Sequence, residues 1–193
     1  MYEFIEGVIV ERSPAHLVIK AGQVAYYLHI SVYTYSQLGE VSEATLFLHH
    51  VVREDAEMLY GFSDRGEREI FRQLISVSGI GANTARLILS SMSPAEVREA
   101  IQSGNVAALQ NIKGIGAKSA QRVIVDLRDK IGKAEETGEF MLQQDNTVRE
   151  EALSALVALG FPKKNVEKNL DKLLAGDAEM TVEEVVKAAL KLM

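Results

Sequence analysis

The residues best suited to bind a ligand in this sequence are the glycines of a repeated Gly-Ile-Gly-Ala motif. The motif stands at residues 79–82 and again at residues 114–117, and the segments around the two copies align with each other. Two glycines in a short turn let the backbone bend sharply and approach a ligand closely. Free N–H groups at the start of the following helix form an anion site. Each copy therefore predicts a helix, a tight turn and a second helix that can hold a phosphate without reading a base.

The side chains beside these glycines favour a DNA-backbone site. Lys118, Ser119 and Arg122 follow the second copy, where a cation or a hydroxyl can support a phosphate. The first copy has Asn83 and Thr84 instead of a cation, which leaves its share of the affinity open. A single Gly-Ile-Gly is explained equally well as a helix connector, but two copies in register favour backbone binding. The full candidate set is Gly79, Gly81, Asn83, Thr84, Gly114, Gly116, Lys118, Ser119 and Arg122.

The segment before these motifs reads as β structure. Short runs rich in β-branched and aromatic residues, separated by turn signals, predict five strands. They lie at residues 2–10, 17–20, 24–30, 45–52 and 58–60, with one helical stretch around residues 34–38. Five short strands in so few residues suit a small closed barrel, such as the oligonucleotide-binding (OB) form, better than an open sheet with exposed edges.

From Asp64 onward the hydrophobic period is helical. Four pairs have the spacing of a reciprocal capping box: Asp64 with Glu67, Ser93 with Glu96, Thr147 with Glu150, and Thr181 with Glu184. An apolar stripe predicts one long helix that ends at Gly132, and its members are Ala120, Val123, Ile124, Leu127 and Ile131. Three further amphipathic segments, at residues 147–159, 162–174 and 182–192, predict a small three-helix bundle.

These elements predict a multi-domain α+β protein. We expect an OB-like barrel at residues 1–63, an all-helical domain with both motifs at 64–132, and a three-helix domain at 147–193. Residues 133–146 are polar, acidic and without periodicity, so they are expected to form a flexible linker.

Composition narrows the function classes. The chain has no cysteine, which excludes disulfides, thiolate zinc sites and a cysteine nucleophile, and it has no apolar stretch of membrane-spanning length. A soluble protein of a reducing cytosol is expected. The net charge of −6 is unevenly spread: residues 1–64 hold nine acidic and three basic residues, whereas residues 65–131 hold ten basic and six acidic ones. The helical middle is therefore expected to grip DNA, with the acidic barrel touching it selectively or repelling it.

No pattern in the sequence predicts a cofactor or metal. Residues 114–119 lack the spacing of a triphosphate-binding loop, and the histidines His16, His29, His49 and His50 lack metal-ligand spacing. Two rivals stay open. One is a DNA repair enzyme, a glycosylase or nuclease fragment, with Asp126 or Asp129 as its carboxylate, although solvation of a helix face explains both. The other is an interaction adaptor that does not bind DNA.

The paired motifs resemble helix-hairpin-helix motifs, and the whole layout resembles the RuvA family of bacterial Holliday-junction proteins. The most specific local match is VVREDA at residues 51–56, followed by LYGF at residues 59–62. The resemblance implies that Glu54 and Asp55 form an acidic pin. In that family, four such pins surround the centre of a four-way junction in a flat homotetramer.

The same resemblance implies a non-catalytic subunit that works with partners. The C-terminal domain would dock RuvB, a hexameric ATPase, with Leu156, Leu159 and Phe161 as candidate contacts, although core packing explains most of them equally well. Whether two tetramers associate face to face, and whether a RuvC resolvase shares the complex, stays open. The setting implied is homologous recombination, DNA repair and the SOS response in the bacterial cytoplasm.

Overall fold

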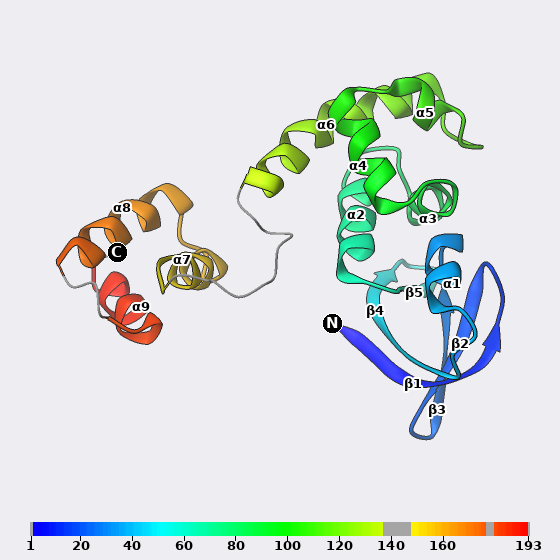
Figure 1. The fold of residues 1–193 in the computed structure, drawn as a ribbon, viewed down its shortest axis with the longest axis horizontal. Coiled ribbons are helices and arrows are strands. Elements are labelled where there is room, and N and C mark those ends of the chain that lie inside the picture. Colours follow the sequence, from blue (N-terminus) through cyan, green and yellow to red (C-terminus); the bar gives the residue numbers. More distant parts are fainter. Residues whose placement is uncertain (1, 137–147, 177–179, 193) are drawn as a thin grey trace. The chain divides into compact units, whose positions relative to one another are not determined.

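The computed structural model describes residues 2–136, 148–176 and 180–192. The chain divides into two compact units, Met1–Phe140 and Met141–Met193. Figure 1 shows a barrel and a group of helices in the first unit and helices alone in the second. The predicted α+β class, with an N-terminal barrel followed by helices, is confirmed.

The barrel is closed by five strands in the order β1-β2-β3-β5-β4, in which β3 pairs parallel with β5 and the other pairs are antiparallel. Alternate residues point inward and fill it with Ile5, Leu17, Ile19, Leu28, Ile30, Leu46 and Leu48. A short helix, α1 (Val32–Leu38), follows β3. The strands are β1 (Phe4–Arg12), β2 (His16–Ala21), β3 (Val24–His29), β4 (Glu43–Val52) and β5 (Glu57–Phe62).

Five helices complete the first unit and pack around a second core that includes Tyr60 and Phe62 of the barrel. The predicted stripe on α6 is entirely buried in it. The helices are α2 (Arg65–Ile75), α3 (Ala82–Ser91), α4 (Pro94–Ser103), α5 (Val106–Gln110) and α6 (Ala117–Glu136). The predicted end of α6 at Gly132 is wrong. A glycine ends a helix when it turns left-handed, as Gly104 does after α4 with φ of 71°, whereas Gly132 stays helical.

The predicted capping boxes differ in outcome. Ser93 with Glu96 forms the full reciprocal pair at the start of α4. Asp64 accepts the backbone N–H of Glu67 at 2.8 Å, but the Glu67 side chain turns into the barrel and does not return to the cap. The reciprocal prediction is therefore wrong for this pair, because buried hydroxyls of the barrel take the carboxylate instead. Thr147 lies outside the described residues.

The buried carboxyl of Glu67 makes stability depend on pH. Burial raises its pKa above the ordinary value of 4.5, against the opposing effect of hydrogen bonds from Ser31 and Thr34. A carboxyl whose folded-state pKa is raised stabilises the fold below its unfolded pKa and loses that contribution as pH rises through the folded pKa. We expect the free energy of unfolding of the wild type, minus that of Glu67→Gln, to fall as pH rises from about 4 to about 8. Urea titrations of both proteins measure this difference; a difference that stays flat or rises contradicts the assignment.

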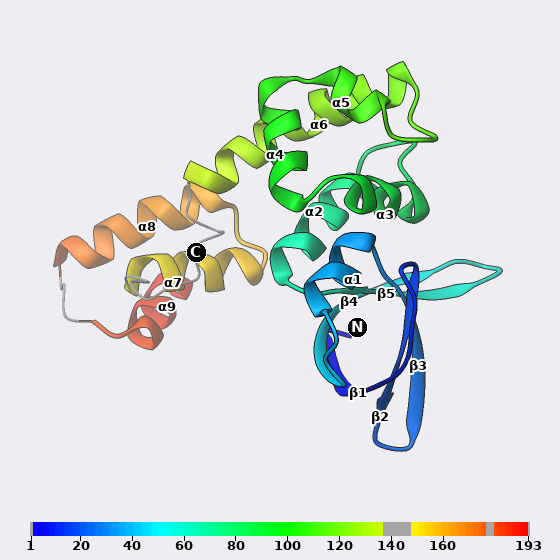
Figure 2. The ribbon, with the colours of Figure 1, turned by 45° about the vertical axis from the view of Figure 1, so that its right-hand side comes forward.

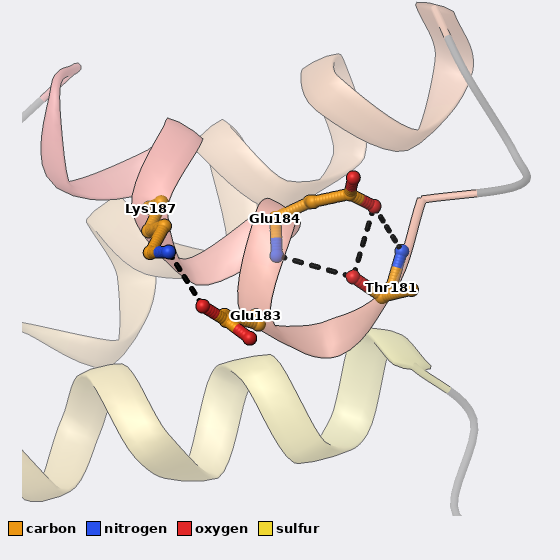
Figure 3. A network of polar contacts seen from close by, with 4 residues as sticks. All are labelled: Thr181, Glu183, Glu184 and Lys187. Atoms are coloured by element: carbon orange, nitrogen blue, oxygen red, sulfur yellow. Dashed lines mark hydrogen bonds and ion pairs between the residues drawn. The ribbon is translucent and has the colours of Figure 1, made fainter.

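The second unit is a bundle of α7 (Val148–Ala158), α8 (Lys163–Gly176) and α9 (Val182–Leu190). Its core is Ala152, Leu156, Val166, Leu170, Val185 and Ala189. Figure 3 shows the predicted capping box at α9: Thr181 N and Oγ1 each donate to Glu184 Oε2 at 2.9 Å, and Glu184 N donates to Thr181 Oγ1. Beside it, Lys187 pairs with Glu183. The predicted capping box of Thr181 with Glu184 is confirmed.

The linker predicted at residues 133–146 starts inside α6, whose helix reaches Glu136, and its remaining residues lie outside the described ones. None of the helices in the described ranges is both long and apolar enough to cross a membrane.

Candidate nucleic-acid interface

The two Gly-Ile-Gly turns have the same local structure. Their first glycines are left-handed, with φ of 92° at Gly79 and 89° at Gly114. In each turn the N–H of the central isoleucine donates three residues back, Ile80 to Val77 O at 3.0 Å and Ile115 to Ile112 O at 3.1 Å. Ile80 and Ile115 are almost fully buried, so each turn is anchored in the core by the residue between its glycines. The repeat in the sequence is thus a repeat in structure.

The second glycines are not required by the fold. Gly81 has an ordinary extended conformation, with φ of −85°, and the N–H groups of Ala85 and Ala120 donate to Gly81 O and Gly116 O as the helices begin. A Cβ built at Gly81 or at Gly116 would meet nothing within 4 Å. The missing side chain therefore leaves the backbone open to a group from outside. No side chain caps the N-terminus of α3, so its first N–H groups are free to serve an anion.

The predicted residues of the second turn lie close to it. Lys118 is exposed and Ser119 half-buried in the first turn of α6. The Arg122 guanidinium donates to Ser78 O at 3.3 Å, which links α6 to the first turn. The two turns are therefore neighbours, and Arg122 contributes to their spacing as well as to the local positive charge.

The predicted residues of the first turn are partly engaged by the barrel. Asn83 is exposed, but its Oδ1 accepts from the hydroxyl of Tyr60 at 3.4 Å. Thr84 is half-buried, and Arg86, one turn into α3, donates to Ala15 O at 2.8 Å. The first turn is thus fastened to the barrel by Asn83 and Arg86.

Lys113 is a candidate that sequence reasoning missed. It is exposed and stands directly before Gly114, where it adds a second cation beside the turn. The signal in the sequence was a cation directly before the second copy of the motif, at the position where the first copy has Ser78.

Glu54 and Asp55 stand at the tip of the hairpin between β4 and β5. The strands stay paired up to Val52 and Glu57, and Arg53 N donates to Ala56 O at 2.9 Å to close the turn. Both acidic side chains are exposed. Figure 2 shows this hairpin reaching out from the barrel, toward the same side of the unit as the two glycine turns. The unit therefore presents free backbone N–H groups and an acidic tip on one side.

The residues considered for catalysis or metal binding are not assembled into such a site. Asp126 and Asp129 are both exposed on α6. His49 packs on the ring of Phe71 and His29 on that of Tyr60, and burial lowers the pKa of both histidines. Across the described residues, no group of three or more histidine and carboxylate side chains is placed to hold a metal ion.

The candidate partner contacts in the second unit separate by burial. Leu156 is fully buried in the core, so it cannot itself contact a partner, and that assignment is corrected. Leu159 is 62% exposed. Phe161 lines a hollow of about 390 Å³ together with Leu192, Lys168 and Lys172. Leu159 and Phe161 remain as candidates.

Comparisons with known proteins cover the whole chain. The family model described as RuvA N terminal domain matches residues 1–61, that of the SAM-like helix-hairpin-helix tandem matches residues 71–129, and that of the RuvA C-terminal domain matches residues 147–193. Two curated relatives, from Christiangramia forsetii and Flavobacterium psychrophilum, are each 47% identical over 191 residues, 99% of this chain and 99% of their own length. A third, from Bacteroides fragilis, is 46% identical over 199 residues and also covers 99% of both chains. All three are named Holliday junction branch migration complex subunit RuvA.

Proposed function

The chain belongs to the RuvA family, and from that premise we propose that it is the subunit of a branch-migration complex that binds four-way (Holliday) DNA junctions. The observation that carries the proposal is the pair of neighbouring glycine turns with open backbone. Contacts of backbone N–H groups and cations to phosphate fix the position of a duplex without reading its sequence. The chain therefore binds DNA by structure rather than by sequence.

The acidic hairpin supplies the preference for a junction. Glu54 and Asp55 repel phosphates that come close to them. A continuous duplex across the tip is disfavoured by this repulsion, whereas the open centre of a junction leaves room for the tip. The two residues thus act as a pin at the point where strands exchange.

A homotetramer matches the four arms of the substrate. Closed fourfold symmetry would place four acidic tips around the centre and give each arm its own pair of glycine turns. Individually weak phosphate contacts, repeated over all arms, add up to tight binding that still lets the DNA slide. We therefore expect four chains to bind on each face of a junction.

Residues 114–119 lack the spacing of a triphosphate-binding loop, so we assign the movement of the junction to a partner. We assign recruitment of the RuvB ATPase to the C-terminal domain, residues 147–193, with contacts at Leu159 and Phe161. The barrel at residues 1–63 carries the pin and the helices at residues 64–132 hold the arms. The setting we propose is recombination and repair in the bacterial cytoplasm.

Lys118 provides a graded test of the phosphate contacts. Lys118→Gln removes one cation from the second turn, so affinity should fall by a similar factor for junction and duplex of any sequence. The slope of log affinity against log salt should become shallower by about 0.9 for each phosphate that the variant no longer neutralises. Lys130→Gln, on an exposed part of α6 away from the turns, is the control and should leave the slope unchanged. An unchanged slope in Lys118→Gln removes this residue from the interface.

The shape of the bound junction tests the function as a whole. In Mg²⁺ a free junction folds with its arms stacked in pairs, so fluorescence transfer between end-labelled arms differs strongly between arm pairs. Binding should make all adjacent pairs equivalent, because the protein holds the arms open and flat. Transfer efficiencies that keep the stacked pattern at saturating protein contradict the proposal.

A further inference from the structure

Buried polar side chains in this protein are concentrated at one place. Across residues 2–136, 148–176 and 180–192, the polar or charged side chains that are buried are Ser31, Thr34, Glu67 and Arg68. All four lie where the first turn of α2 meets the barrel, within the first unit.

Glu67 reaches from α2 to the segment around α1. The hydroxyls of Ser31 and Thr34 donate to its two carboxylate oxygens, the second at 2.5 Å. The Ser31 hydroxyl also accepts Thr34 N at 2.9 Å, which caps α1, and the Ser63 hydroxyl lies 3.3 Å from the same carboxylate. One fully buried carboxyl thus fixes the start of α1 to the start of α2.

Arg68 reaches to a different part of the barrel. Its Nη1 donates to Glu3 O at 2.9 Å and to Leu48 O at 3.4 Å, and its Nη2 pairs with the Glu3 carboxylate at 2.6 Å. The guanidinium lies over the ring of Phe47, 5.4 Å from its centre. Because Leu48 and Phe47 belong to β4, Arg68 holds the strand that continues into the acidic hairpin.

The elements that these two residues hold together lead to both DNA-facing features, the glycine turns and the acidic hairpin. α2 ends at Ile75, four residues before Gly79, and β4 ends at Val52, two residues before Glu54. Burying a charged side chain adds little net stability, because the cost of desolvation offsets the interactions that its partners supply. A fully hydrogen-bonded buried network instead selects one relative arrangement of the parts that it joins.

We propose that Glu67 and Arg68 are positioning residues that fix the acidic hairpin relative to the glycine turns and thereby set the preference for junction over duplex. This inference rests on the proposed function. The glycine turns grip the duplex arms of either DNA, whereas the hairpin repels a continuous duplex and fits the centre of a junction. The ratio of the two affinities therefore depends on where the hairpin stands relative to the turns.

The first experiment compares dissociation constants for an immobile junction and for a linear duplex. In Glu67→Ala, the ratio of junction affinity to duplex affinity should fall by about tenfold, the effect of losing one buried charged hydrogen-bond partner. Glu67→Gln keeps the shape and acceptor oxygen and should restore most of the preference. Glu99→Ala, an exposed acid on α4, is the matched control and should behave as wild type. Thr34→Val, which removes one hydroxyl and keeps the side-chain shape, provides the same comparison if Glu67→Ala does not fold.

The second experiment measures the geometry without DNA. The chain has no cysteine, so Val52→Cys on the hairpin and Gln110→Cys on α5 can be spin-labelled uniquely, and both positions are exposed. Labelled chains are diluted in an excess of unlabelled chains, so that distances between chains of the proposed tetramer do not contribute. The distance distribution between the two labels should then be narrow in the wild type and in Glu99→Ala, and broad in Glu67→Ala and in Arg68→Met.

The outcomes separate the inference from the function beneath it. A folded Glu67→Ala protein with an unchanged junction-to-duplex ratio and a narrow distance distribution overturns the positioning role. A wild-type protein that binds junction and duplex equally contradicts the proposed function instead, and the distance distributions then still decide whether Glu67 and Arg68 hold the hairpin in place.

Discussion

Replacing Gly81 and Gly116 together with valine is expected to weaken DNA binding by about a hundredfold and to leave the fold intact. Each valine adds a side chain where a phosphate must come close to backbone N–H groups, and a hydrogen bond to a charged group contributes about 1.5 kcal/mol or more, a tenfold change in affinity. The backbone accommodates an added Cβ at both positions, because Gly81 has φ of −85° and neither Cβ meets an atom within 4 Å. Fluorescence anisotropy with labelled duplex and junction measures the loss, which should affect both.

The choice of glycines separates binding from folding. Gly79 and Gly114 are left-handed, so a side chain there strains the backbone and lowers stability along with binding. Ala95→Val, which enlarges an exposed residue in the first turn of α4, is the control and should bind as the wild type does. A Gly81 and Gly116 double variant with wild-type melting temperature and wild-type affinity removes the glycine turns from the interface.

Neutralising the pin should strengthen binding to duplex DNA, whereas the glycine substitutions weaken it. Glu54→Gln with Asp55→Asn removes two negative charges per chain from the hairpin tip, and repulsion from a nearby phosphate is about 1 kcal/mol per charge pair in water at 4 Å. We expect affinity for linear duplex to rise by about tenfold at low salt, with a smaller change for the junction. The gain should shrink as salt is raised, because screening acts over about 10 Å at 0.1 M.

The position of the charge is the point that this prediction tests. Glu40→Gln with Glu43→Gln removes two exposed acids near the other end of β4, so it matches the change in net charge without touching the tip. It should raise duplex affinity much less than the pin variant does. Equal gains from both variants would reduce the pin to a contribution to overall charge, and a loss of duplex affinity in the pin variant would contradict repulsion.

What could be predicted from the sequence follows from how local each signal is. The two glycine turns were found because a turn depends on its own residues: the left-handed glycine, the buried isoleucine and the helix start all lie within a few positions. The five strands were found for the same reason, since alternation along each strand reports which residues face the barrel interior.

The joint between barrel and helices could not be predicted, because it depends on partners far apart in the chain. Asp64 and Glu67 have the local spacing of a capping box, yet hydroxyls at Ser31 and Thr34 compete for the carboxylate and prevail. The sequence leaves open whether Leu156 belongs to the core or to the surface, and packing of the bundle leaves it 0% exposed. In both cases the deciding neighbours come from another element, which hydrophobic period alone does not identify.

The most direct test of the central claim is a competition gel shift of the purified protein between a synthetic immobile four-way junction and a linear duplex of the same sequence, at moderate salt with Mg²⁺. The account predicts strong preference for the junction, with the first saturated complex holding four chains. Equal affinity for both DNAs would contradict it and leave a general helix-hairpin-helix DNA binder, and absence of binding to either would leave an adaptor that does not act on DNA.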